Sequence, residues 1–360
     1  GVVPTAGIAY LTKLIGADYG VVISASHNSG EYNGIKVFNS EGYKLGDKEE
    51  ERIERCFIHE KTNDFPDIGS YEQDLHLIKR YREFLLNAVE HSFAGKTIVL
   101  DGAFGAAHRI APDVFRRAGA SVIAANCVDD GLSINRNCGA VYPHNLARKV
   151  LRYKADMGFA FDGDADRLIA VDEHGDVIDG DMILCALAKY FDAQGKLPCR
   201  TAVGTSHTNM AIENDLKAHG ISLVRTDIGD KYVLARLLEK GYSLGGEQSG
   251  HIILKDYATT GDGILTAIAL TNMLISENKT LAEGVKIPLY PQENKNVPVE
   301  DKFRVINSEE LSKQVAKYTA ALAGKGRLMI RASGTEPKIR VMVESKDEAL
   351  NREVAAALVA

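Results

Sequence analysis

Three aspartates stand at alternate positions in the stretch Phe161–Arg167, which reads FDGDADR. Asp162, Asp164 and Asp166 follow an apolar run that predicts a buried strand, so an extended loop can direct all three carboxylates to one point. Three carboxylates this close repel one another without a cation, and oxygen ligands of this kind suit a hard divalent ion. We therefore predict a Mg²⁺ site at the end of this strand, with one position open for a phosphate oxygen.

An EF-hand is the alternative for this stretch, because Glu173 is the twelfth residue counted from Asp162. The sixth position is Arg167, where the turn of an EF-hand needs glycine. The flanking runs MGFAF and LIAVD also read as strands rather than helices. The EF-hand is excluded on both grounds.

Ser26 lies in a second polar loop, Ser24–Gly30, directly after the apolar run Tyr19–Ile23. The run predicts a buried strand, and the small polar residues after it predict a tight loop. A nucleophile on a loop held by a rigid sheet is a common catalytic arrangement. Taken alone, an ordinary Ser/Asn/Gly turn is the more frequent explanation, and it is the other polar loops that favour catalysis.

A third polar loop lies within Leu244–Leu254, which reads LGGEQSGHIIL. Glu247, Ser249 and His251 alternate between glycines, and their side chains can bind adjacent hydroxyls of a sugar. His251 could also move a proton near neutral pH. A polar turn with a hydrogen-bonded histidine is the alternative, and taken alone this loop favours it.

The fourth polar loop lies near the C-terminus, in the stretch IRASGTEPKIRV. Guanidinium groups, hydroxyls and a glycine turn together can cradle a phosphate. No Walker motif occurs in the chain, and a turn with solvated arginines is the alternative. The residues concerned are Arg331, Ser333, Gly334, Thr335 and Arg340.

Alternating strand and helix patterns must position these loops. A length of 360 residues indicates two to four domains. From Lys96 to Leu274 strands alternate with helices, which predicts α/β units with mostly parallel sheets, and the C-terminal part reads as α+β. We further expect a long helix over 71–89, a loop at Lys61–Ser70 and a linker at Ile287–Pro298.

Composition narrows the class of protein. A formal charge of −6 argues against a nucleic-acid or membrane-surface partner, and no apolar run approaches the ~18 residues of a membrane-spanning helix. The cysteines are five in number and form no CxxC pair, which favours a reducing compartment, here the cytoplasm, and gives no zinc or disulfide signal. They are Cys56, Cys127, Cys138, Cys185 and Cys199.

In this order, the four loops resemble the signature loops of the α-D-phosphohexomutase superfamily: SASHN at Ser24, DGDADR at Asp162, GEQSGH at Gly246 and RASGTEP at Arg331. The resemblance implies a multidomain α/β fold, with three α/β domains of mixed sheets and a C-terminal α+β domain of the TBP-like type. The implied boundaries are 1–76, 77–176, 177–288 and 289–360. Members of the superfamily begin with a strand and a TDGIRG-like loop, so we expect that the first part of domain 1 is missing from this sequence.

The resemblance also implies roles for single residues. Ser26 corresponds to the serine that is phosphorylated in the resting enzyme, and its phosphate completes the Mg²⁺ site of the three aspartates. Lys36 corresponds to a general acid/base, and His251 to a residue implicated in proton transfer on the other side of the sugar. The implied substrate-binding residues are His27, Arg167, Lys231, Glu247, Ser249, Arg331, Ser333, Gly334, Thr335 and Arg340.

Within the superfamily, Gln248 in GEQSGH resembles the phosphoglucosamine mutases, whereas the phosphomannomutase/phosphoglucomutase relatives usually carry methionine there. This implies an isomerase that interconverts glucosamine 6-phosphate and glucosamine 1-phosphate through a phosphoserine and a 1,6-bisphosphate, on the route to UDP-N-acetylglucosamine and cell-wall precursors. One Mg²⁺ and a bisphosphate sugar as activator are implied, with a sugar phosphate as the partner and a homodimer left open. A phosphomannomutase/phosphoglucomutase and a non-catalytic sugar-phosphate-binding relative remain as alternatives.

Three residues depart from the pattern of the superfamily. Ser29 replaces proline after SASHN, which should make that loop less rigid. Ala165 replaces the commoner glycine, a mild change if its φ is negative. Lys231 replaces arginine, so a bidentate phosphate contact would become a point-charge contact.

Overall fold

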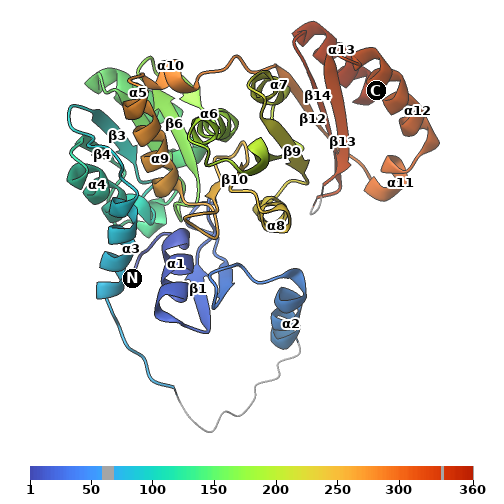
Figure 1. Ribbon diagram of the computed structural model, residues 1–360. Helices are drawn as coiled ribbons and strands as arrows, with labels where there is room; N and C mark the ends of the chain where they lie inside the picture. Colours follow the sequence, from blue (N-terminus) through green and yellow to red (C-terminus); the bar gives the residue numbers. More distant parts are fainter. Residues whose placement is uncertain (59–68, 334–335, 360) are drawn as a thin grey trace. The chain divides into compact units, whose positions relative to one another are not determined.

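Figure 1 shows the computed structural model of the chain, which describes residues 1–58, 69–333 and 336–359. The chain forms two compact units: one contains Gly1–Thr208 and Leu216–Lys286, the other Asn209–Asp215 and the chain from Ile287 onward. All five cysteines are free thiols. Among the described helices, none is long and apolar enough to cross a membrane. The predicted loop Lys61–Ser70 falls almost entirely outside the described residues.

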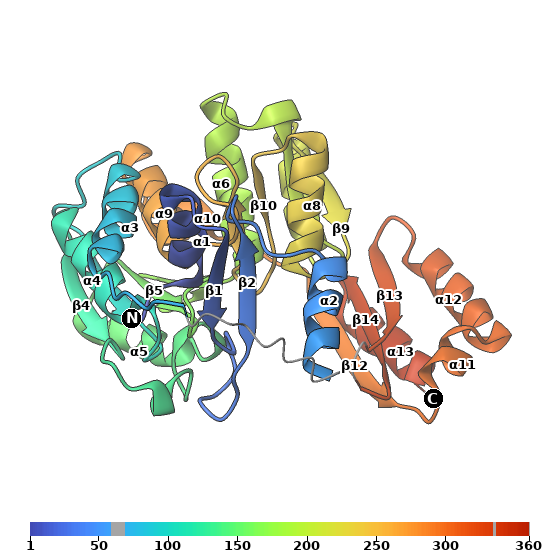
Figure 2. The same cartoon turned by 90° about the horizontal axis from the view of Figure 1, so that it is seen from below.

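The N-terminal part of the first unit is a two-stranded antiparallel sheet with a helix on one face. β1 (Tyr19–Ile23) pairs with β2 (Ile35–Asn39), and Figure 2 shows the two strands side by side next to α1 (Thr5–Ile15). Gly20 allows the helix to approach, because a Cβ there would lie 2.0 Å from Thr12 Oγ1. Burial alternates along β1, so the predicted buried strand is buried on one face only. The Ser26 loop begins where β1 leaves this sheet.

A five-stranded mixed sheet carries the aspartate turn. Its order is β4-β3-β5-β6-β7, with β3 parallel to β4 and β5, and β6 antiparallel to β5 and β7. The expected mostly parallel arrangement fails at β6, because a short turn cannot make the long crossover that a parallel pair needs. The strands are β3 (Thr97–Asp101), β4 (Ser121–Ala125), β5 (Met157–Phe161), β6 (Leu168–Asp172) and β7 (Val177–Ile178).

A four-stranded mixed sheet carries the third polar loop. Its order is β11-β10-β8-β9; β8 runs parallel to β9 and β10, and β11 returns antiparallel to β10. Residues 247–251 therefore form a tight connection at the end of β10. The strands are β8 (Thr201–Thr205), β9 (Ser222–Thr226), β10 (Leu244–Gly246) and β11 (Ile252–Leu254).

Helices cover these two sheets, and α9 is the most deeply buried of those described. It is apolar on nearly all sides and packs against β5, β6 and β11. Asp262 caps its N-terminus and accepts a 2.8 Å hydrogen bond from the Tyr81 hydroxyl of α3.

The helix predicted over 71–89 is shorter, because α3 begins only at His76, whose N–H donates to Asp74. The helices after α1 are α2 (Asp47–Ile58), α3 (His76–Asn87), α4 (Ala107–Arg117), α5 (His144–Tyr153), α6 (Gly180–Ala193), α7 (Met210–Ala218, shared by the two units), α8 (Asp230–Lys240), α9 (Gly263–Ser276) and α10 (Leu281–Val285), with 3₁₀ turns at Gly131–Ser133, Gly139–Val141 and Pro198–Arg200.

The second unit is an antiparallel sheet of order β12-β14-β13 with helices, and the two units together confirm the predicted α/β multidomain fold class. The linker prediction for Ile287–Pro298 is wrong, because Gln292–Pro298 forms strand β12 along β14. The run QENKNVP is polar and partly exposed, so it lacks the apolar alternation that marks a strand. The elements are β12 (Gln292–Pro298), α11 (Lys302–Ile306), α12 (Glu309–Leu322), β13 (Gly326–Ala332), β14 (Lys338–Ser345) and α13 (Glu348–Val359).

Candidate active site

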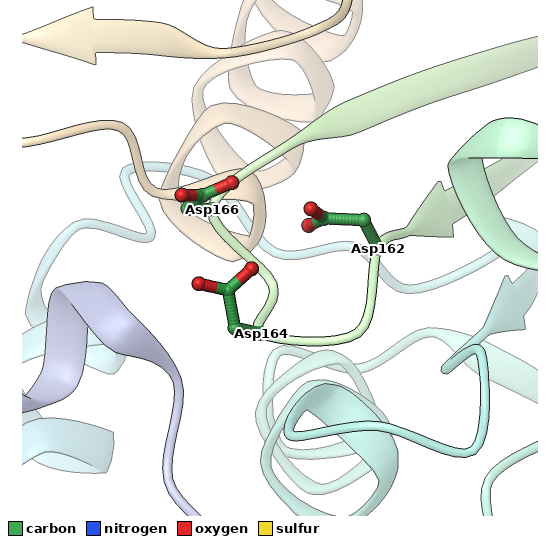
Figure 3. Close-up of side chains that lie close together, drawn as sticks. All are labelled: Asp162, Asp164 and Asp166. Carbon is green, nitrogen blue, oxygen red and sulfur yellow. The ribbon is translucent and has the colours of Figure 1, made fainter. Parts of the chain in front are cut away.

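The turn between β5 and β6 brings the three aspartates together (Figure 3). A carboxylate oxygen from each of Asp162, Asp164 and Asp166 lies within 4.8 Å of the others, and all three residues are buried. Ala165 in this turn has a φ of 59°. The condition for a mild substitution, a negative φ, is therefore not met, and Ala165 holds a left-handed conformation that favours glycine.

Two buried oxygens of the cluster have no hydrogen-bond partner among the described residues, Oδ1 of Asp164 and Oδ1 of Asp166. Oδ2 of Asp164 accepts 2.5 Å hydrogen bonds from Thr5 Oγ1 and Lys36 Nζ, and Oδ2 of Asp166 lies 3.0 Å from the same Nζ. Leaving a buried carboxylate oxygen without a donor is costly, and a hard cation with oxygen ligands would satisfy both atoms. The donor set therefore fits Mg²⁺.

The cluster also perturbs the pKa values of its own groups. Burial raises the pKa of Asp162 well above its usual value, and the charges of Asp166 and Asp164 add to the effect. At Asp166 burial acts in the same direction, but His251 and Lys36 outweigh it and hold the pKa well below its usual value. Burial would lower the pKa of Lys36, yet Asp166 and Asp164 raise it, so this side chain is a cation. One ammonium thus faces the acidic cluster.

Ser26 meets this cluster from a different part of the chain. Its Oγ donates a 2.9 Å hydrogen bond to Asp162 Oδ2, and its backbone N–H donates to Ser24 Oγ at 2.9 Å. The φ of Ser26 is 53°, a left-handed conformation that serine adopts rarely. A phosphate on this oxygen would lie at the cation site that the carboxylates form.

A pocket of about 450 Å³ in the first unit contains four of the predicted substrate-binding residues, together with His207 and Gln248. Glu247 Oε1 accepts a 3.0 Å hydrogen bond from the N–H of Gly229, which fixes the carboxylate, and burial raises its pKa. Burial lowers the pKa of the His27 imidazole and nearby Arg167 lowers it further, so the ring is neutral at neutral pH. The four predicted residues are His27, Arg167, Glu247 and Ser249.

His251 lies close to Asp166 of the aspartate turn and is not among the residues that line this pocket. It is 3% exposed, and its Nε2 accepts a 3.1 Å hydrogen bond from the Gly261 N–H. That bond assigns the ring proton to Nδ1, which lies 3.6 Å from Asp166 Oδ1. This contact is longer than a hydrogen bond, so Asp166 Oδ1 stays without a donor among the described residues, and the predicted proton transfer by His251 stays a prediction.

Lys231 also lies outside the residues that line the pocket. Its Nζ is 2.8 Å from Asp47 at the start of α2, and both side chains are more than half exposed. Sequence reasoning missed Thr5, Lys44 and Asp230. Lys44 pairs with Asp230, whose Oδ2 lies 3.8 Å from His251 Nε2. No motif surrounds Thr5 or Lys44, whereas Asp230 directly precedes the predicted residue Lys231, and this neighbour was a signal that could have found it.

In the second unit, two of the predicted phosphate-binding residues lie directly opposite each other. Arg331 on β13 pairs in register with Arg340 on β14, and the Nε atoms of both are buried without a partner among the described residues. Like charges on facing strand positions repel, which favours an anion here, and Glu336 already supplies one negative charge 3.2 Å from Arg340 Nη2. Ser333 is buried nearby and its N–H donates to Lys338 O. Gly334 and Thr335 lie outside the described residues.

Four family models match the chain in order along nearly its whole length. All four describe the phosphoglucomutase/phosphomannomutase family: alpha/beta/alpha domain I at residues 1–64, alpha/beta/alpha domain II at 79–175, alpha/beta/alpha domain III at 179–290 and the C-terminal domain at 295–360.

Curated relatives are identical to the chain at close to half of the aligned positions. The phosphoglucosamine mutase of Caldicellulosiruptor saccharolyticus is 48% identical in an alignment of length 358 that covers 96% of this chain and 79% of that protein. The phosphoglucosamine mutase of Alkaliphilus oremlandii is 45% identical in an alignment of length 355 that covers 97% of this chain and 79% of that protein.

Solved structures share the fold at lower identity. A phosphoglucomutase/phosphomannomutase family protein of Burkholderia thailandensis superimposes with a TM-score of 0.82 at 23% identity, covering 98% of this chain and 80% of that one. The N-acetylphosphoglucosamine mutase of Aspergillus fumigatus, in complex with GlcNAc-6P and magnesium, gives 0.69 at 18% identity, covering 99% and 92%.

Proposed function

The chain belongs to the phosphoglucomutase/phosphomannomutase family, and we propose that it is a phosphoglucosamine mutase that interconverts glucosamine 6-phosphate and glucosamine 1-phosphate. The observation that carries the proposal is the 2.9 Å hydrogen bond from Ser26 Oγ to Asp162 Oδ2. It puts a nucleophilic oxygen on a carboxylate cluster that fits Mg²⁺. The choice of sugar rests on the relatives at 43–48% identity.

In the proposed reaction Ser26 carries a phosphate at rest. The bond from phosphorus to Ser26 Oγ breaks as a bond to a sugar hydroxyl oxygen forms, which gives the 1,6-bisphosphate. The hydroxyl loses its proton and the freed Ser26 oxygen gains one, with Lys36 and His251 as the proposed proton-transfer residues. The bisphosphate then turns over, and Ser26 takes the other phosphate back. This route is needed because O6 and O1 of one sugar are too far apart for direct transfer.

The three aspartates would hold the Mg²⁺ ion together with the phosphate on Ser26. When bound, the ion neutralises negative charge on the phosphoryl group that is transferred. Lys36 adds positive charge, since its ammonium contacts Asp164 and Asp166. Arg167 also adds positive charge, since its Nε lies 3.8 Å from Asp162 and 3.9 Å from Asp166. In this proposal Lys36 is also the general acid/base, although Asp166 and Asp164 raise its pKa and so make its ammonium hold the proton more tightly.

The remaining site residues would bind the substrate. In this proposal Glu247 and Ser249 hold sugar hydroxyls in the pocket, and Lys231 contributes a point charge. The phosphate that does not react is held in the second unit by Arg331, Ser333, Gly334, Thr335 and Arg340. The proposal includes four domains with boundaries near 76, 176 and 288, a cytoplasmic enzyme activated by a bisphosphate sugar, and no nucleic-acid or membrane partner. It places the reaction on the route to UDP-N-acetylglucosamine and leaves a homodimer open.

Substituting Ser26→Ala tests the reaction class. We expect loss of turnover by about three orders of magnitude or more, because the phosphate acceptor is removed. Ser29→Ala, in the same loop and exposed, is the matched control and should keep turnover close to that of the unsubstituted protein. Full activity in Ser26→Ala would end the proposal.

The sugar is tested by comparing kcat/KM for the 6-phosphates of glucosamine, glucose and mannose. We expect the highest value for glucosamine 6-phosphate. A clear preference for mannose or glucose 6-phosphate would instead establish the phosphomannomutase/phosphoglucomutase alternative. Binding of all three without turnover would establish a non-catalytic relative.

A further inference from the structure

A buried asparagine between β4 and α5 holds the backbone of the Ser26 loop. Asn135 is 4% exposed, and its Nδ2 donates hydrogen bonds to the carbonyl oxygens of Ser26 at 2.8 Å and Asn28 at 2.7 Å. These bonds span 109 and 107 positions of the chain. One side chain therefore fixes two peptide groups of the loop that carries the nucleophile.

The orientation of this amide follows from its partners. Carbonyl oxygens only accept hydrogen bonds, so the nitrogen of Asn135 must face them. Its Oδ1 is buried and has no partner among the described residues. The backbone of Asn135 is fixed as well: its N–H donates to Ala103 O at 3.0 Å, and its φ of 58° is one that asparagine tolerates well. Both donor hydrogens are thus committed to the Ser26 loop.

The aspartate turn packs against the contact between Asn135 and the Ser26 carbonyl. Gly163 lies so close that a Cβ there would be 2.5 Å from Ser26 O and 2.7 Å from Asn135 Nδ2. The Ser26 loop, the aspartate turn and Asn135 therefore meet where no further side chain fits. Holding the Ser26 carbonyl against this turn sets the distance between Ser26 Oγ and Asp162.

Ser26 needs such a support because its φ of 53° is unfavourable for serine. The loop around it is half-exposed or exposed and gains little from packing. We propose that Asn135 is a positioning residue for Ser26, which keeps the Ser26 oxygen at the carboxylate cluster through both phosphoryl transfers. This inference rests on the proposed phosphoserine function.

Substituting Asn135→Asp removes both donors and keeps the shape of the side chain, so an oxygen faces two carbonyl oxygens. We expect kcat to fall about 10- to 100-fold, because displacement of a reacting atom by about 1 Å has a cost of that size. The KM for the sugar phosphate should stay within about twofold, since Asn135 is not among the residues that line the sugar pocket. The rate at which glucosamine 1,6-bisphosphate phosphorylates Ser26, followed by intact mass, should fall by the same factor as kcat.

Asn137→Asp is the matched control. It makes the same substitution in the same loop at a φ of 54°, but on an exposed side chain. We expect it to keep kcat, KM and the rate of Ser26 phosphorylation. Asn135→Gly is the second variant, because glycine accepts the left-handed backbone while the two hydrogen bonds are lost. It should fold, as judged by circular dichroism, and show the same loss in kcat at unchanged KM.

The outcomes separate the inference from the proposed function. If the unsubstituted protein takes no phosphate on Ser26, the proposed function fails. If it takes phosphate and both Asn135 variants turn over at its rate, or lose only thermal stability, the inference is overturned. If Asn135→Asp does not fold, the kcat and KM of Asn135→Gly alone decide whether the inference holds.

Discussion

The ammonium of Lys36 lies 3.0 Å from Asp166 Oδ2 and at the same time contacts Asp164. Three buried carboxylates thus share one lysine, with Arg167 and His251 at longer distances. Because two carboxylate oxygens of the cluster have no donor among the described residues, the protein alone leaves this charge incompletely compensated. A divalent cation would complete the compensation.

Addition of Mg²⁺ to protein treated with a chelator should therefore raise the Tm and restore turnover. At a concentration of 100 Kd the expected stabilisation is about 2.7 kcal/mol. Asp164→Asn should lose both effects, because it removes one ligand charge. Asp176→Asn, an aspartate paired with Lys286 on the surface, is the control and should respond like the unsubstituted protein. Equal Tm shifts in all three proteins would contradict a site at the aspartate turn.

The bond between Tyr81 and Asp262 ties α3 to the start of α9, and its loss should destabilise the first unit. Tyr81→Phe leaves a buried carboxylate oxygen without its donor, which should lower the free energy of unfolding by about 1–3 kcal/mol. Tyr190→Phe is the matched control: that hydroxyl is also buried, yet it has no partner among the described residues. Urea unfolding should show little or no loss in the control.

The loss of unfolding free energy in Tyr81→Phe should depend on pH. Burial raises the pKa of Asp262 from 3.8 to about 6, so the folded state binds this proton more tightly than the unfolded state. The contribution of Asp262 to stability therefore increases as the pH falls from about 6 towards 4. The difference in unfolding free energy between Tyr81→Phe and the unsubstituted protein should be larger at pH 7, where the carboxylate is charged, than at pH 4. An equal difference at both values would contradict the assigned role of Asp262.

Glu247 should make sugar binding depend on pH. Its carboxylate accepts stronger hydrogen bonds from sugar hydroxyls when it is charged, and burial raises its pKa. The KM of the unsubstituted protein should therefore rise as the pH falls, at a higher pH than an exposed glutamate would give. Glu247→Gln should raise KM about tenfold at neutral pH and remove this dependence. Ionisation of the substrate phosphate affects both proteins equally, so it cancels in the ratio of the KM of Glu247→Gln to that of the unsubstituted protein. If this ratio stayed constant with pH, Glu247 would be excluded as the source of the pH dependence.

The facing arginines of the second unit should bind the phosphate that does not react. Arg331→Met should raise the KM for the sugar phosphate at least about tenfold, with a smaller effect on kcat, because a charge-assisted contact is lost. Arg304→Met removes an exposed arginine of the same unit and serves as the charge-matched control. Inhibition by inorganic phosphate should weaken in the first variant only. Identical KM values in both variants would argue against an anion site at Arg331.

The sequence predicts those parts of the fold that carry strong local patterns. The apolar runs of β1, β3 and β5 and the helix α1 lie where the pattern places them, and each polar loop follows a strand. β12 was missed because its residues are polar, and its pairing with β14 is a contact between segments distant in the sequence. The positive φ of Ala165 could not be predicted either, because the turn imposes it and the residue type does not indicate it.

The candidate site was predictable where its residues belong to the four polar loops, and not where single residues outside these loops contact them. Asp162, Asp164 and Asp166 stand out because their spacing is unusual. Thr5 and Asn135 are common polar residues in unremarkable surroundings, and only the folded chain brings them to Asp164 and Ser26.

The most direct test of the account is the phosphorylation of Ser26. Intact mass and phosphopeptide mapping should be measured before and after incubation with glucosamine 1,6-bisphosphate and Mg²⁺. We expect a single phosphate, located on Ser26, that exchanges with the bisphosphate. Absence of phosphate from Ser26 under all these conditions would contradict the phosphoserine mechanism and leave a protein that only binds sugar phosphates.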